Sequence, residues 1–298
     1  MKESGVKIIA VKPSFVLMIV VIAVLIGVIP AAAQMPPIRI ACIGNSITIG
    51  YGLPDPNSAY PQQLGRLLGS KYDVRNFGVS GRTMLKEGDY PYWKETFYKE
   101  ALAFKPQIVT ICLGTNDSKP WNWKYKADFF DDYMDMIHSF REVNPNVQIF
   151  VCLPPPVFNS KFGITDSVVH REVVPIVNAV RIASDSYPID FYNTLTADSA
   201  DFFDGVHPDS TGDSIMAHIA YEAIQSSPSG IIRDFSAGAR DAAGHVTLYW
   251  ETTAGSTVTL NGKKVDASGS MAMTPAVNST YTLVTSGAVS DTSTVSFP

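Results

Sequence analysis

Short apolar runs alternate with amphipathic stretches over the first two thirds of the chain. Five runs read as buried strands, at residues 37–43, 72–77, 107–113, 147–153 and 189–191. Five segments carry apolar residues at helical spacing, at 60–72, 92–104, 127–142, 166–184 and 213–225. Strands that alternate with helices predict a parallel sheet with helices on both faces. We therefore expect a three-layer α/β/α domain with a five-stranded sheet.

The pattern changes after residue 226, where serine, proline and glycine form a short linker at 227–230. Polar and apolar residues then alternate at 246–250, 256–260, 271–273, 280–284 and 292–297, with glycine and asparagine turns between them. This predicts an α/β domain at 34–226 followed by a small β-sandwich at 231–298, with Trp250 in its core. The sandwich is either a spacer or a module for carbohydrate binding or surface attachment.

The first 33 residues have the features of an export signal. Three lysines precede an apolar run at 15–30, and Ala31-Ala32-Ala33 offers small residues for cleavage near Ala33. The alternative is an uncleaved anchor, although the run falls short of the ~20 residues that a span needs. We expect the mature protein to be periplasmic, extracellular or attached to the cell surface.

Charge and cysteine content exclude several classes of function. The formal net charge is −5 and lysine and arginine form no cluster, which disfavours nucleic acid and, beyond the export signal, a membrane as partner. Cys42, Cys112 and Cys152 each lie in an apolar run, so we expect buried free thiols rather than disulfides. No Cys/His spacing resembles a zinc site, and we expect no metal and no cofactor.

The residues that carry chemistry follow predicted strands. Ser46 stands in a glycine-rich turn after the first strand, where open α/β sheets bind ligands. The G-x-S-x-G nucleophile elbow is excluded because Thr48 replaces the second glycine. A single serine at a strand end is more often a cap or turn former. The other strand ends are needed to give Ser46 a role.

Four segments together resemble the sequence blocks of the SGNH, or GDSL-type, hydrolase family, in the same order. They are Gly44-Asn-Ser46, Asn76-Phe-Gly-Val-Ser-Gly81, Gly114-Thr-Asn-Asp117 and Asp204-Gly-Val-His207. Asn45 departs from the aspartate of many members. The resemblance covers residues 38–225 and implies a flavodoxin-like fold and a serine hydrolase.

Each of these residue types has a chemical reason. A serine hydroxyl needs a base, which His207 can supply through Nε2, and Asp204 can accept Nδ1–H and fix the tautomer. An oxyanion needs preorganised donors, for which Ser46 N–H, Gly81 N–H and the Asn116 amide are available. We expect Gly81 to let the backbone come close. Asn116 has an alternative role as an Asx-turn residue.

The expected function is that of an exported serine esterase that acts through an acyl-enzyme on Ser46. Residues 81–83 and 116–123 resemble bacterial members that act on carbohydrate or sialate O-acetyl esters, which implies a small ester or an acetylated carbohydrate as substrate. The alternatives are an arylesterase or a lysophospholipase, and an inactive carbohydrate-binding protein. Trp121 and Trp123 either line the mouth of the site or pack in the core. The oligomeric state stays open.

Overall fold

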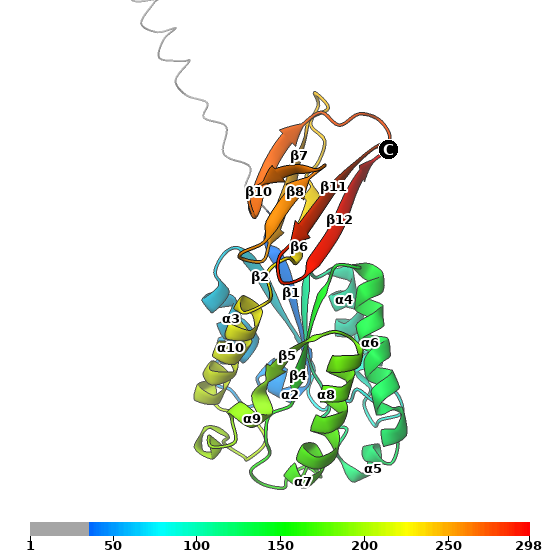
Figure 1. Cartoon of the computed structure of the whole chain (residues 1–298). Coiled ribbons are helices and arrows are strands. Elements are labelled where there is room, and N and C mark those ends of the chain that lie inside the picture. The colour runs from blue at the N-terminus through cyan, green and yellow to red at the C-terminus, as the bar shows by residue number, and fades with distance from the viewer. Residues whose placement is uncertain (1–35) are drawn as a thin grey trace, which may run out of the picture. The chain divides into compact units, whose positions relative to one another are not determined.

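A five-stranded parallel sheet forms the centre of the larger domain (Figure 1). The computed structural model describes residues 36–298, so the predicted signal peptide lies outside them. The strand order is β2-β1-β3-β4-β5. The strands are β1 (Ile38–Gly44), β2 (Tyr72–Gly78), β3 (Ile108–Cys112), β4 (Gln148–Leu153) and β5 (Tyr187–Asp190). The predicted three-layer α/β/α fold is confirmed.

Helices cover both faces of this sheet (Figure 1). One face packs against α3 (Tyr60–Leu68) and α10 (Ser210–Gln225), and these two helices also pack against each other. The other face packs against α4 (Thr96–Ala103), α6 (Phe129–Val143) and α8 (Val174–Ala183). Within residues 36–298, every helix is too short or too polar to span a membrane.

The central strands are apolar on both sides because both sides are buried. In β1, Ile40 and Cys42 belong to the core under α3 and α10, whereas Ala41 and Ile43 belong to the opposite core. Fully burying a side chain of this size contributes about 1.5–3 kcal/mol. The three cysteines are buried and free, as the sequence predicted.

Two of the predicted helices are irregular. Residues 92–104 divide into a 3₁₀ turn (Tyr92–Lys94) and α4, and residues 166–184 divide into α7 (Asp166–Val168), a π-helical stretch (Val169–Val173) and α8. Pro175 lies in the first turn of α8 and has no N–H to donate to the preceding turn, which accounts for the widened helix before it. Short helices that the sequence pattern missed are α2 (Ser46–Ile49), α5 (Pro120–Trp123) and α9 (Phe191–Thr194).

The C-terminal residues form two antiparallel sheets, ordered β10-β7-β6 and β12-β11-β8-β9. Trp250 is buried in the core between them, as predicted. The strands β6 and β9 were missed by the sequence pattern. The bounds are β6 (Ile232–Ala237), β7 (Val246–Thr252), β8 (Thr257–Leu260), β9 (Lys263–Val265), β10 (Ser268–Met273), β11 (Ser279–Ser286) and β12 (Ser290–Phe297).

Polar contacts cross the segment that the sequence identifies as a linker. The guanidinium of Arg233, in β6, donates to the Tyr72 hydroxyl at 2.6 Å and to the Ile224 carbonyl at 2.7 Å. The Gln107 amide donates to the Asp234 carboxylate at 2.7 Å. Residues 226–231 connect α10 to β6, and the first strand after them makes hydrogen bonds to the sheet domain, which a freely jointed linker would lack.

A buried carboxyl group joins α3 to α10. Asp213 accepts the Tyr60 backbone N–H at 2.7 Å, and its other oxygen has no hydrogen-bond partner among the described residues. Burial, with a smaller effect from the nearby Asp209, raises the pKa of Asp213 to about 8. The folded protein therefore holds this proton at pH values where the unfolded chain has released it.

Replacing this carboxyl group should change how stability depends on pH. Because the folded pKa is raised, wild-type stability falls as pH rises from about 4 towards 8, by about 1.4 kcal/mol per pH unit for one proton. Asp213→Asn keeps the acceptor for Tyr60 and removes the titration. The free energy of unfolding can be measured with urea at pH 5 and at pH 8. From pH 5 to pH 8 the variant should gain about 3 kcal/mol of unfolding free energy relative to wild type.

A matched control is Asp131→Asn, because Asp131 is exposed in the first turn of α6. This variant should keep the wild-type difference between pH 5 and pH 8. If the unfolding free energies of wild type and Asp213→Asn changed with pH in parallel, Asp213 would be ionised in the folded state and the account would be wrong.

Candidate active site

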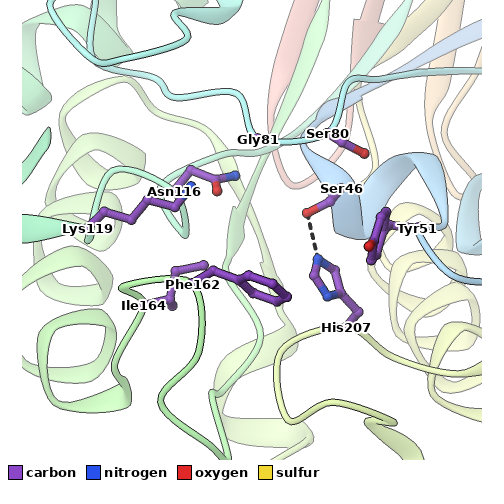
Figure 2. Close-up of a pocket in the computed structure, with 9 residues that line it drawn as sticks. All are labelled: Ser46, Tyr51, Ser80, Gly81, Asn116, Lys119, Phe162, Ile164 and His207. Atoms are coloured by element: carbon purple, nitrogen blue, oxygen red, sulfur yellow. Dashed lines mark hydrogen bonds between the residues drawn. The ribbon is translucent and has the colours of Figure 1, made fainter. Parts of the chain in front are cut away.

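The predicted strand ends meet in one pocket, at the edge of the sheet where the parallel strands finish (Figure 2). The cavity measures about 180 Å³, which is small beside the ~300–1,000 Å³ of most ligand sites. Its lining residues are Ser46, Tyr51, Ser80, Gly81, Asn116, Lys119, Phe162, Ile164 and His207. Parallel strands place their carboxyl ends together, so residues far apart in sequence converge here.

Ser46 is the first residue of the short helix α2, directly after β1. The Asn45 side chain accepts the Ile47 N–H at 3.0 Å and so begins the helix. Asparagine and aspartate are both favoured N-caps, so the departure from Gly-Asp-Ser keeps the cap. The cap fixes the turn that presents the Ser46 hydroxyl to the pocket.

Ser46, His207 and Asp204 form a continuous hydrogen-bonded series. His207 Nε2 lies 2.9 Å from Ser46 Oγ (Figure 2). His207 Nδ1 lies 3.0 Å from Asp204 Oδ2. Asp204 Oδ1 also accepts the backbone N–H groups of Val206 and His207, at 3.0 and 2.8 Å. The spacing D-x-x-H therefore closes a turn in which one carboxylate holds both the backbone and the ring of the histidine.

The electrostatics keep Asp204 ionised. Its burial acts to raise the pKa, but hydrogen bonds from the His207 ring and from the two backbone N–H groups outweigh burial, and the pKa is lowered. Lys161 Nζ lies 3.8 Å from Asp204 Oδ2 and adds a positive charge. An anionic Asp204 beside Nδ1 stabilises an imidazolium at His207.

Three candidate donors for an oxyanion line the same pocket. The backbone N–H groups of Ser46 and Gly81 make no hydrogen bond to any of residues 36–298, so both are free to receive a ligand oxygen. The Asn116 amide donates to the Arg82 carbonyl at 3.2 Å through its Nδ2, which has a second N–H. Gly81 has φ +81°, and a Cβ there would contact nothing within 4 Å. The positive φ favours glycine at this position, and the open space beside it leaves room for a ligand.

Asp117 holds two of these segments together. Its carboxylate accepts the Met84 N–H at 3.1 Å and the Leu85 N–H at 2.8 Å. Burial, only partly offset by these hydrogen bonds, raises the pKa of Asp117 to about 7. Asp117 therefore ties the loop that follows Gly81 to the Asn116 segment.

The two predicted tryptophans have different positions. Trp123 is 7% exposed, packs on Phe129 and donates to Glu172 at 2.8 Å. Of the two alternatives considered for Trp123, the structure shows core packing. Trp121 is 49% exposed and donates to Asp89 at 2.8 Å, beside the pocket.

Other residues form the pocket wall that the sequence did not predict. Tyr51 and Phe162 lie on opposite sides of the His207 ring in Figure 2, with ring centroids 4.7 and 5.8 Å from it. Lys119 adds a half-buried ammonium whose pKa is lowered by desolvation. Phe162 has φ +58° in a tight turn before Gly163. The only sequence feature that pointed to a turn here was the dipeptide Phe-Gly in the loop that begins with three prolines.

Comparison with known proteins shows which family the chain resembles. The model of the GDSL-like lipase/acylhydrolase family matches residues 42–215. An acetylxylan esterase from Xylanibacter ruminicola is 41% identical over 216 residues, which cover 66% of this chain and 45% of that protein. The chain thus matches less than half the length of this relative.

Solved structures share the fold. An aryl esterase from M. smegmatis aligns with a TM-score of 0.53 and 19% identity, over 63% of this chain and 99% of that one. A carbohydrate acetylesterase from Sinorhizobium meliloti aligns with a TM-score of 0.53 and 17% identity, over 63% and 98%. The match of the family model over more than half of the chain shows that this protein belongs to the GDSL-like lipase/acylhydrolase family.

Proposed function

We propose that the protein is a serine esterase that removes acetyl groups from carbohydrate esters. The observation that carries the reaction type is the series from Ser46 Oγ through His207 to Asp204, with contacts of 2.9 and 3.0 Å. This is the arrangement that acyl transfer by an activated serine requires. The reaction also requires donors for the developing oxyanion, and the free backbone N–H groups of Ser46 and Gly81 can supply them.

Acylation begins when Ser46 Oγ attacks the ester carbonyl carbon and its proton passes to His207 Nε2. The carbonyl oxygen becomes an oxyanion, which Ser46 N–H, Gly81 N–H and the Asn116 amide stabilise. Removing one such donor typically costs about 3–4 kcal/mol in the transition state. The tetrahedral intermediate collapses, His207 returns the proton to the leaving alcohol oxygen, and an acetyl-enzyme remains on Ser46.

Deacylation repeats these steps with water as the nucleophile. His207 Nε2 takes a proton from the water, the hydroxide attacks the acetyl carbonyl, and the proton returns to Ser46 Oγ as acetate leaves. Asp204 stays ionised throughout because its pKa is lowered, and it stabilises the imidazolium in both halves of the reaction. No metal or redox step is needed for this sequence of proton transfers.

Two observations support an O-acetyl carbohydrate as substrate. The relative from Xylanibacter ruminicola is named an acetylxylan esterase, and one structural neighbour is a carbohydrate acetylesterase. The pocket is small, and Phe162 and Ile164 form part of its wall, which favours a short acyl group. Such a substrate is consistent with export through the signal at residues 1–33, which we also propose.

The contributions of His207 and Asp204 to the rate can be measured separately. His207→Ala removes the base and should lower kcat by about 10⁶-fold, whereas Asp204→Asn should lower it by about 10⁴-fold, because the ring loses its orientation and charge partner but remains present. Steady-state kinetics on p-nitrophenyl acetate give both values.

The chain offers a matched control for this experiment. Asp241 and His245 form an exposed pair at the same 3.0 Å, far along the chain from the pocket residues. Asp241→Asn should retain the wild-type rate. Equal losses in His207→Ala and Asp204→Asn would give Asp204 a different role.

The substrate class is tested by acyl length and by alcohol. An extra methylene changes binding in an apolar pocket by about 1–3 kcal/mol, in either direction according to fit. Because the cavity is small, kcat/KM should fall by at least about tenfold from p-nitrophenyl acetate to the octanoate. Acetate release from acetylated xylan, acetylated sialic acid and peracetylated glucose, compared side by side, identifies the sugar.

Two results would contradict the proposal. A preference for octanoate, or for a single-chain phospholipid, would make the protein a lipolytic acylhydrolase. Rapid turnover of p-nitrophenyl acetate with no acetate released from any acetylated carbohydrate would favour an arylesterase.

A further inference from the structure

Three half-exposed aromatic side chains, one in the pocket wall and two near it, are linked through shared neighbours. They are Phe203, Phe162 and Trp121, with 52, 49 and 49% of their surface exposed. Phe203 stacks beside His207, with centroids 6.0 Å apart and an interplanar angle of 21°, and Phe162 lies 5.8 Å from the same ring. Gly163 follows Phe162 and packs against Trp121. We call these three residues the aromatic row.

The backbone holds the two outer rings in place. A Cβ on Gly52 would lie 2.5 Å from Phe203 Cζ, and a Cβ on Gly163 would lie 2.7 Å from Trp121 Cη2. Both glycines have positive φ, +82° and +78°, and each brings its main chain against one side of a ring. The indole of Trp121 is also fixed by its hydrogen bond to Asp89. The rings are therefore preorganised while half of their surface stays open to solvent.

The composition of this surface favours a carbohydrate over a lipid. The exposed large apolar residues at the site are all aromatic: the row and Tyr51. Exposed aliphatic residues lie elsewhere, such as Leu67 at the end of α3 and Ile182 at the end of α8. Flat rings pack on the C–H faces of sugars, whereas acyl chains are usually bound by deep aliphatic walls.

Polar groups beside the rings support the same ligand. Lys119 Nζ lies 5.9 Å from the centre of the Trp121 ring, and Lys161 Nζ lies 5.3 Å from that of Phe162. No carboxylate among the described residues lies within 4.0 Å of Lys119 Nζ. Ammonium donors next to aromatic faces can bind sugar hydroxyl groups while the rings pack on the sugar.

We propose that the aromatic row binds consecutive units of a carbohydrate chain, so that an ester on one unit reaches Ser46. One pyranose covers about one ring, and three rings in succession therefore fit an oligosaccharide better than a monosaccharide. The row passes His207, whose Nε2 is 2.9 Å from Ser46 Oγ, so a chain along it crosses the catalytic pair. This proposal rests on the proposed function and narrows its substrate to acetylated oligo- and polysaccharides.

The first experiment measures kinetics against chain length, with acetylated xylose and acetylated xylo-oligosaccharides of two to six units. The specificity constant kcat/KM should rise with length, mainly through a lower KM. Phe203→Ala and Trp121→Ala should each raise KM for the hexasaccharide by about three- to tenfold, the fold-change expected for one lost aromatic contact. Phe203→Tyr and Trp121→Phe keep an aromatic ring and should keep KM near the wild-type value.

The second experiment measures binding without catalysis. Calorimetry of unacetylated xylohexaose with the Ser46→Ala protein gives a dissociation constant, which Phe203→Ala or Trp121→Ala added to that protein should raise by a similar factor. Phe97→Ala is the matched control, because Phe97 is 37% exposed on α4 and packs on Phe77 instead. It should leave both KM and the dissociation constant unchanged.

The outcomes separate this proposal from the proposed function. Equal kcat/KM for acetylated xylose and the hexasaccharide, or hexaose binding that is insensitive to both alanine substitutions, would overturn the aromatic row while leaving the acetylesterase intact. Failure to release acetate from any carbohydrate would overturn the substrate class. The binding measurement would then decide the role of the row by itself.

Discussion

The burial of both faces of the parallel sheet is the constraint on which the rest of this structure depends. Strands covered by α3 and α10 on one side and by α4, α6 and α8 on the other are largely apolar, as residues 40–43 of β1 are. The polar residues of the site therefore lie in the loops that follow the strands. Because the strands are parallel, the carboxyl ends share one edge, and Ser46, Gly81 and Asn116 meet there.

Two carboxylates fix the positions of the loops that meet at this edge. Asp204 binds two backbone N–H groups and the His207 ring with one side chain, and Asp117 binds the loop after Gly81 from the Asn116 segment. In both cases an acidic group is buried where charge is costly; hydrogen bonds outweigh that cost at Asp204 and offset only part of it at Asp117. The site is thus positioned by polar contacts that the sheet alone does not provide.

The sequence predicted the elements whose signals are local. The parallel sheet with helices on both faces follows from alternating strands and helices, and the contact between Ser46 and His207 was expected because both stand at element ends in recognisable blocks. The wall of the pocket could not be predicted in this way. Phe162 and His207 are 45 residues apart in sequence, with α8 and β5 between them, so their approach depends on tertiary packing. Likewise, nothing in the spacing of Trp121 and Trp123 shows which of the two faces the core.

The central claim is that Ser46 is the nucleophile, and covalent labelling tests it most directly. A fluorophosphonate should add once to the wild-type protein, and peptide mass spectrometry should place the adduct on Ser46. Ser80→Ala, which changes an exposed pocket serine, should be labelled like wild type, whereas Ser46→Ala should not be labelled and should lose about 10⁶-fold in kcat. An adduct on another residue, or a pure Ser46→Ala protein that retains more than a few per cent of wild-type turnover, would contradict the account.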